Sequence, residues 1–214
     1  MPKPEQEPFD AMKRLGWVAA MAVLLGIGLA ALALWGPRRD AKLPVMSSLP
    51  AFSLIGSDGK PFDSAQLQGK VWVASFVFTS CKNSCPMLGM QMSRLSKLLS
   101  ADERLALVSI TVDPDKDTPK VLEGYAKGLG VADARWHFLT GKKSAIKALV
   151  EKGFLLTADP GAEILDERGQ PDILHSSKLV LVDGQGRIRG YYDGLLGSSV
   201  PALKQHIQQL LKER

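Results

Sequence analysis

The chain has 214 residues, 45% of them hydrophobic, and it carries 27 Lys and Arg against 22 Asp and Glu, for a net charge of +5. This length and apolar content suit one well-cored domain with an appendage, and they argue against two domains. The basic residues are interleaved with acidic ones after residue 43 and form no run beside stacking aromatic side chains, so we expect no nucleic-acid partner.

The appendage is an apolar segment near the N-terminus. Residues 16–35 include no charged side chain, and a helix of that length spans about 30 Å, the thickness of a bilayer core. The competing interpretation is a cleaved signal peptide, whose apolar stretch has only about 7 to 15 residues. Basic residues flank both ends of the segment, so the positive-inside rule does not orient it. The predicted organisation is an N-terminal segment over 1–15, a transmembrane anchor over 16–36, a linker over 37–49 and a domain over 50–214.

From residue 50 onward, strand and helix patterns alternate along the chain. Strands separated by helices of ordinary length predict an α/β fold of three layers around a central sheet, and a hairpin near the C-terminus makes that sheet mixed. The expected elements, in chain order, are a hairpin within 52–62, a strand over 70–79, a helix over 86–99, a strand over 105–113, a helix over 119–129, a strand over 135–139, a helix over 143–152, a hairpin over 178–192 and a helix over 200–211.

The two cysteines of the chain, Cys81 and Cys85, directly follow the predicted strand 70–79. Their place at a strand-to-helix junction fits a thioredoxin-like arrangement, although the spacing is one residue longer than Cys-x-x-Cys. If the following segment is helical, the two are related as i and i+4, with Cβ atoms about 5 to 6 Å apart. That separation permits a disulfide, exchange with another disulfide, or a thiophilic metal held by two thiolates. A purely structural disulfide would stabilise little, because it would close a very short loop.

Three histidines are candidates for a third metal ligand. His175 ends a long loop, 159–174, and immediately precedes a strong strand pattern; long loops inside compact domains are commonly functional. His137 and His206 fit ordinary half-exposed positions on a strand and a helix.

Acidic and thioether side chains near the cysteines carry weaker signals. Asp113 ends a central strand at the same sheet edge as the cysteines, and two roles are open for it: to act on a metal site through a ligand or through its charge, or to serve only as a turn aspartate that leads into the next helix. The segment 117–119, Asp-Thr-Pro, is interpreted as a helix N-cap followed by proline at the first helical position. Met87, Met90 and Met92 are interpreted as core filling, because methionine on a helix usually packs inside.

Several motifs in one order resemble the Sco/SenC family of copper-binding proteins. Phe-x-x-Thr-x-Cys-x-x-x-Cys-Pro begins at Phe76, and the resemblance runs from about residue 50 to residue 210. The motifs that follow are Thr-Val-Asp-Pro at 111–114, Asp-Thr-Pro at 117–119, Phe-Leu-Thr-Gly at 138–141, His-Ser at 175–176, Leu-Val-Asp at 181–183 and Gly-x-Ile-Arg-Gly-x-Tyr at 186–192.

The resemblance implies a thioredoxin-like fold and a copper ion, Cu(I) or Cu(II), bound by Cys81, Cys85 and His175, with an acidic residue near the metal at Asp113. It also implies a single-pass inner-membrane protein with residues 1–15 in the cytoplasm and the C-terminal domain in the periplasm, or in the intermembrane space of a mitochondrion. The implied partners are a copper donor protein, the copper-accepting subunit of cytochrome c oxidase and the lipid bilayer. The implied task is assembly of the dinuclear copper centre of that oxidase.

The resemblance leaves the balance of two chemistries open. Cys81 and Cys85 could deliver copper as a metallochaperone, or act as a redox-active disulfide pair that reduces the acceptor's cysteines. Family members often carry Cys-Pro-Asp-x-Cys, whereas residues 82–84 here are Lys-Asn-Ser, which removes a carboxylate and adds a cation that favours thiolate. The alternatives are a metal-independent thiol–disulfide oxidoreductase or peroxidase-like enzyme, and a redox or copper sensor, on the same fold.

Overall fold

The computed structural model forms two compact units, residues 1–41 and 42–214. In the first unit, residues 16–27 are helical, and residues 28–36 of the predicted anchor lie outside the described part of the chain. Among the described residues, no helix has both the length and the apolarity that a membrane span needs. The residues that the structure describes are 16–27, 42–81, 84–99, 102–131, 133–156 and 177–213.

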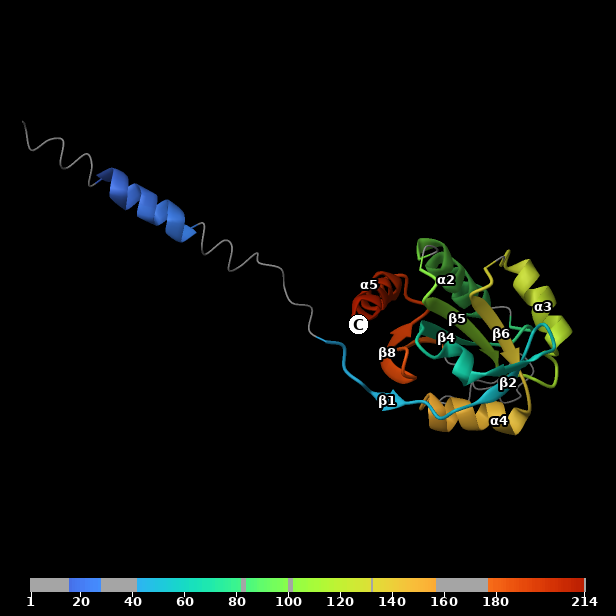
Figure 1. Ribbon diagram of the computed structural model, residues 1–214. Coiled ribbons are helices and arrows are strands. Elements are labelled where there is room, and N and C mark those ends of the chain that lie inside the picture. The colour runs from blue at the N-terminus through green and yellow to red at the C-terminus, as the bar shows by residue number, and fades with distance from the viewer. Residues whose placement is uncertain are drawn as a thin grey trace, which may run out of the picture. The chain divides into compact units, whose positions relative to one another are not determined.

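The second unit is built on a sheet in the order β1-β8-β7-β4-β5-β6-β2-β3 (Figure 1). The central pairs β4–β5 and β5–β6 are parallel, and β4–β7, β7–β8, β2–β6, β2–β3 and β1–β8 are antiparallel, so the sheet is mixed as predicted. The strands are β1 (Ser47–Ser48), β2 (Ser53–Gly56), β3 (Pro61–Asp63), β4 (Val71–Val77), β5 (Leu105–Thr111), β6 (Trp136–Thr140), β7 (Lys178–Val182) and β8 (Arg187–Asp193).

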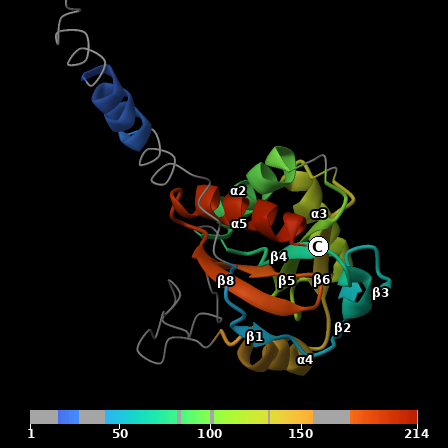
Figure 2. The ribbon, with the colours of Figure 1, turned by 60° about the vertical axis from the view of Figure 1, so that its left-hand side comes forward.

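Helices cover both faces of this sheet, which gives the three layers predicted for an α/β fold (Figures 1 and 2). One face packs against α2 (Ser84–Leu98), α3 (Pro119–Gly128) and α5 (Ser199–Lys212). The other face packs against α4 (Lys143–Ala148) and the π-helical turn η2 (Leu149–Gly153), and the 3₁₀ turn η1 (Ser64–Leu67) contributes Leu67 to the same cluster.

The two central strands, β4 and β5, are buried along their whole length, as expected for apolar runs in a sheet covered on both faces. Successive side chains alternate between the two layers. Val73 and Leu107 pack with α2, α3 and α5, whereas Ala74 and Val108 pack with α4. Because β4 and β5 are parallel, their carboxyl ends meet at one edge, and the segments that follow them become neighbours.

The segment predicted as the end of the linker contributes to the sheet. Residues 47 and 48 pair with Ile188 and Arg187 of β8, and Arg189, itself almost fully buried, holds the residues before them. Its guanidinium donates to the carbonyl oxygens of Leu43 at 2.6 Å and Pro44 at 3.1 Å. A two-residue strand carries no alternation, so sequence periodicity could not reveal it.

An ion pair just before β6 fastens the C-terminal end of α2. The guanidinium of Arg135 binds both carboxylate oxygens of Asp133, at 2.9 and 2.6 Å. The same guanidinium donates to the carbonyl oxygens of Leu99 and Asp102, each at 2.9 Å, and of Ser96 at 3.3 Å. One side chain therefore satisfies carbonyl groups at the C-terminal end of α2 that have no partner inside the helix.

This arrangement perturbs the Asp133 carboxyl. Burial acts to raise its pKa, but hydrogen bonds from Arg135 and Ser96 outweigh burial and lower the pKa from 3.8 to about 2. A folded-state pKa below the unfolded value gives stability that is present above pH 3.8 and is lost as the pH falls toward 2. The shift corresponds to about 2 kcal/mol.

We predict that Asp133→Asn lowers the free energy of unfolding by about 2 kcal/mol at pH 7, and that its difference from the unsubstituted protein shrinks at pH 2 to 3. Urea unfolding at the two pH values measures both quantities. Glu123→Gln is the control, because Glu123 forms an exposed pair with Lys127 and its loss should change stability little. An Asp133→Asn effect of equal size at both pH values would contradict the assignment to this carboxyl.

Candidate copper and thiol site

Cys81 and Cys85 lie at the junction between β4 and α2: Cys81 is in the connecting turn and Cys85 is in the helix. The amide of Cys81 donates to the carbonyl oxygen of Phe78 at 3.1 Å, which closes a turn after the strand. Helix α2 begins at Ser84, so Cys85 lies in its first turn. The amide of Cys85 donates to the sulfur of Cys81 at 3.3 Å. The structure therefore brings the two cysteines together at a helix N-terminus, where amide dipoles favour a thiolate.

The two cysteines differ in access. Cys85 is fully buried against the apolar cluster on the α4 side of the sheet, whereas Cys81 is half-buried. A reagent or partner can therefore reach Cys81 first. Residues 82 and 83, which include the lysine that departs from the family pattern, lie outside the described part of the chain.

Asp117 fixes the start of the cysteine turn from the neighbouring strand. Its fully buried carboxylate accepts hydrogen bonds from the amide of Thr79 at 3.0 Å, from the hydroxyl of Thr79, and from the hydroxyl of Thr111 at 2.6 Å. Thr79 lies two residues before Cys81, and Thr111 is the last residue of β5. The carboxylate therefore ties the ends of the two parallel strands together immediately beside the site.

The sequence interpretation of residues 117–119 as an N-cap followed by proline at the first helical position is confirmed. The N-cap of α3 is Thr118, whose side chain accepts from the amide of Val121 at 3.4 Å, and Pro119 is at the first helical position as predicted. Asp117 points inward instead of capping the helix. Both residue types cap helices well, so local sequence could not tell which one was free for the buried role.

Asp113 lies at the same sheet edge but makes different contacts. Its amide donates to the Thr111 hydroxyl at 3.0 Å, and its backbone carbonyl accepts from the amides of Lys116 and Asp117. The Nζ of Lys116 lies 3.1 Å from its Oδ2. That buried oxygen has no partner in hydrogen-bond geometry among the described residues. Asp113 thus has a buried carboxylate oxygen that can accept a further hydrogen bond. It lies next to Thr111, which Asp117 ties to the start of the cysteine turn.

Of the three histidines proposed as candidate ligands, the structure describes the contacts of two. The ring of His137 packs against Phe62 at a tilt of 47°, with ring centroids 4.8 Å apart, and burial lowers the pKa of His137. The Nδ1 of His206 bonds to the hydroxyl of Tyr192 at 2.5 Å. Both histidines therefore serve packing and hydrogen bonding. His175 lies outside the described residues.

The three methionines after the cysteines differ in burial. Met92 is fully buried in the core between α2 and the sheet, as predicted. Met87 and Met90 are 40% and 63% exposed, so they lie on the outer surface of α2, contrary to the core role predicted for all three. Met87 and Met90 lie on the side of α2 that faces solvent, whereas Met92 lies on the side that faces the sheet. The pattern of apolar residues over so few positions did not distinguish the two sides.

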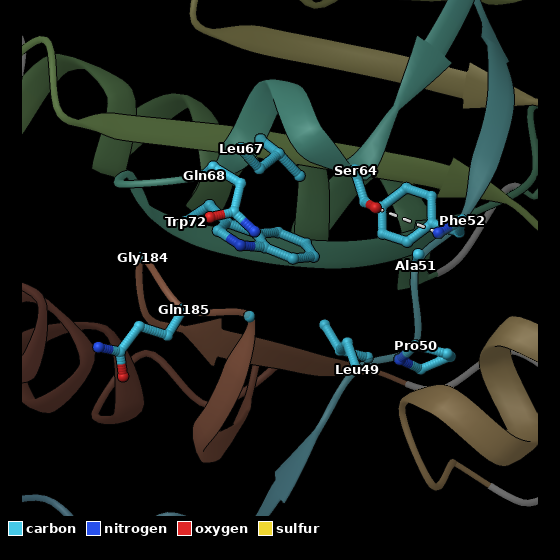
Figure 3. A pocket seen from close by; sticks show the side chains of 11 residues that line it. Leu49, Pro50, Ala51, Phe52, Ser64, Leu67, Gln68, Trp72, Gly184 and Gln185 are labelled. Atoms are coloured by element: carbon cyan, nitrogen blue, oxygen red, sulfur yellow. Dashed lines mark hydrogen bonds between the residues drawn. The ribbon is translucent and has the colours of Figure 1, made fainter.

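A hollow elsewhere on the domain is separate from the cysteines. A cavity of about 120 Å³ lies beside Trp72, near the start of β4, and Figure 3 shows the side chains that line it. The cysteines follow the other end of that strand. Beside the cavity the amide of Phe52 donates to the hydroxyl oxygen of Ser64 at 3.1 Å. No cysteine lines this hollow, so it belongs to the opposite edge of the sheet.

The donor set of the site is two thiols that converge at one helix N-terminus. Thiolates are soft ligands that suit copper, and the partial exposure of Cys81 gives an ion access. Within the described ranges, no group of three or more His, Cys, Asp or Glu side chains is arranged to hold a metal ion. The thiol pair therefore fits part of a copper site, which needs at least one further ligand from elsewhere.

Comparison with known proteins identifies the family. A family model described as SCO1/SenC matches residues 43–212. The SCO1 protein homolog of Bacillus subtilis (strain 168) is 31% identical over 159 residues, 73% of this chain and 79% of that protein. A Stutzerimonas stutzeri protein that is named as a copper-binding protein is 34% identical to this chain over 151 residues, which are 70% of this chain and 71% of that protein.

Similarity in structure leads to the same family. BsSco, described as having a disulfide switch and as a member of the Sco family of cytochrome c oxidase assembly proteins, superimposes with a TM-score of 0.67. The match has 27% sequence identity and covers 80% of this chain and 98% of that one. The three-layer α/β fold predicted as thioredoxin-like is therefore that of a solved Sco protein. On sequence and fold together, this chain belongs to the SCO1/SenC family.

Proposed function

We propose that this protein binds copper through Cys81, Cys85 and His175 and passes it to the copper-accepting subunit of cytochrome c oxidase during assembly of the dinuclear copper centre. The observation that carries the proposal is the contact between the Cys85 amide and the Cys81 sulfur, 3.3 Å apart at the start of α2, in a chain of the SCO1/SenC family. Two soft thiolates and one imidazole suit copper in either of its common oxidation states.

The choice of His175 as third ligand rests on where the described chain resumes. Ser177, two residues after it, accepts a hydrogen bond from the amide of Gly194 at 2.8 Å. A Cβ on Gly194 would collide with the side chain of Leu88, which lies one turn after Cys85 on α2. Ser177 and the first turns of α2 therefore meet at Gly194, so the described chain resumes close to the helix that carries Cys85.

A second candidate function uses the same cysteines without metal. A thiolate on the accessible Cys81 would attack an acceptor disulfide, forming a mixed disulfide and releasing one acceptor thiolate. Attack by Cys85 on the Cys81 sulfur would then release the second acceptor thiolate and leave Cys81 and Cys85 joined, with two electrons passed to the acceptor. The description of BsSco as containing a disulfide switch favours this chemistry as a companion of copper delivery.

The surroundings of the site extend the proposal. Asp113 would act on copper through a neighbouring ligand or through its charge, which its partly unsatisfied buried carboxylate supports.

We also propose that residues 16–36 anchor the protein in the inner membrane, with the domain in the periplasm or the intermembrane space. The run of uncharged residues over 16–35 supports this anchor. A copper donor protein would supply the ion there.

We predict that the unsubstituted protein binds one copper ion, and that Cys81→Ser, Cys85→Ser and His175→Ala each weaken binding more than about 100-fold, beyond the loss expected for a residue that only orients a ligand. Copper titration with parallel thiol counting measures the affinity and the stoichiometry. Disulfide exchange should persist in His175→Ala, because both cysteines remain.

The matched control is His206→Gln, which changes a histidine bonded to Tyr192 and should leave copper affinity unchanged. Full copper affinity in His175→Ala would overturn the ligand assignment. Absence of copper binding by the unsubstituted protein, together with active disulfide exchange, would favour the metal-independent oxidoreductase.

The buried Asp117 makes a separate prediction about how the cysteine turn is positioned. Asp117→Ala leaves the amide of Thr79 and the hydroxyl of Thr111 without their acceptor, so we expect a loss of about 2 to 4 kcal/mol of stability. We also expect faster alkylation of the buried Cys85 under conditions where the variant is folded, because the turn loosens. Urea unfolding and mass spectrometry of thiol alkylation measure the two effects.

Asp115→Ala is the matched control, since Asp115 lies in the same loop, is 65% exposed and pairs with Lys143 at the surface. Its stability should change by no more than about 0.5 kcal/mol. Asp117→Asn, which keeps one accepting oxygen, should restore part of the alkylation protection. Protection of Cys85 in Asp117→Ala equal to that of the unsubstituted protein would mean that this carboxylate does not position the site.

A further inference from the structure

Tyr125 on α3 carries a buried hydroxyl group that the fold itself does not use. The hydroxyl oxygen is inaccessible to solvent, and among the described residues it has no hydrogen-bond partner. Its ring packs edge-on against Phe138, with centroids 6.1 Å apart, in the core between the sheet and its helices. A phenylalanine would make the same packing contacts without burying an unsatisfied polar group, so packing alone does not account for the tyrosine.

The path of the two helices brings Tyr125 on α3 alongside the first turn of α2. Helices α2 and α3 follow the parallel strands β4 and β5, so both start at the same sheet edge and run in the same direction. Gly89 of α2 lies against Leu129 at the end of α3, because a Cβ on Gly89 would be 2.9 Å from Leu129 Cδ2. One helical turn earlier, the corresponding residues are Cys85 on α2 and Tyr125 on α3.

Electrostatics agree with this placement. Burial raises the pKa of Tyr125 to about 12, and negative charge at Cys85, Cys81 or Asp117 would act in the same direction. A tyrosine hydroxyl is a donor at neutral pH even without this shift. Thiolates are strong acceptors for such a donor, whereas a neutral thiol is a weak one.

We propose that the Tyr125 hydroxyl is a positioning donor for the cysteine pair: it hydrogen-bonds the sulfur of Cys85 when that sulfur is anionic, in the reduced pair or in the copper-loaded site. The copper-loaded half of this inference rests on the proposed function, and the reduced-pair half does not. The bond would stabilise the reduced form relative to the disulfide and draw electron density from a copper-bound thiolate. Tyr125 would thus tune both chemistries of the site without contacting copper.

The decisive experiment is the redox equilibrium of the copper-free protein with glutathione. In that reaction the Cys81–Cys85 disulfide and two glutathione thiols give two cysteine thiols and one glutathione disulfide. Tyr125→Phe should lower the equilibrium constant for reduction by about tenfold, since the variant loses a hydrogen bond to a charged group in the reduced form. A purely structural tyrosine would leave this constant unchanged, because phenylalanine keeps the ring packing.

Tyr192→Phe is the matched control. Burial also raises the pKa of Tyr192 to about 12, but its hydroxyl bonds to His206 and not to the site. This variant should lose some stability and keep the unsubstituted equilibrium constant. A decrease of equal size in both variants, or an unchanged constant in Tyr125→Phe shown by urea unfolding to be folded, would overturn the proposal.

A second readout follows the copper-loaded site. In protein loaded with Cu(II), the sulfur-to-copper absorption band of Tyr125→Phe should shift to longer wavelength, because the thiolate becomes a better electron donor without the hydrogen bond. Failure of the unsubstituted protein to bind copper would refute the proposed copper function and leave the glutathione equilibrium as an independent test of Tyr125. An unshifted band in a variant that shows the redox change would restrict the hydrogen bond to the reduced, copper-free pair and overturn the copper half.

Discussion

The buried carboxylate of Asp117 is the constraint on which the arrangement of the site depends. A charged group removed from water must be compensated by hydrogen bonds, and here Thr79 and Thr111 supply them from the ends of two parallel strands. The chain after β4 therefore leaves the sheet in one direction, toward the turn that holds Cys81. The first turn of α2, with Cys85, then follows from that direction.

This constraint brings together groups that favour an anionic sulfur. The Cys85 amide reaches the sulfur of Cys81, and the helix N-terminus adds its dipole. Tyr125, one turn before the contact between Gly89 and Leu129, holds a buried hydroxyl without a hydrogen-bond partner among the described residues. Features that favour a thiolate suit both a soft metal and disulfide exchange.

Other contacts stabilise the domain away from this edge. Arg189 binds the backbone of residues 43 and 44 and pairs with Asp183 at 2.9 Å, which holds the incoming chain to the far side of the sheet. Arg135 fastens the C-terminal end of α2 to the segment before β6. With both ends of α2 held, by Arg135 at one and by the Asp117 turn at the other, local changes at the cysteines need not disturb the core.

Much of the architecture followed from the sequence because the signals were local. Apolar runs predicted β4 and β5, helical periodicity predicted α2, α3 and α5, and the position of Cys81 and Cys85 after a strand predicted a strand-to-helix junction. The pattern of motifs also pointed to the SCO1/SenC family. Each of these signals depends on neighbouring residues in the chain, so no knowledge of distant contacts was needed.

Tertiary structure decided the roles that depend on distant partners. Asp117 and Thr118 are both good helix caps, and only the arrival of Thr79 from β4 shows which one is buried. In the sequence Tyr125 looks like an ordinary helix residue, and only the parallel course of α2 and α3 brings it alongside the first turn of α2. The short strand at residues 47 and 48 likewise exists because β8 lies alongside it. Composition and spacing therefore determined the elements and the reactive pair, whereas burial and contacts between segments far apart in the chain determined which side chains support that pair.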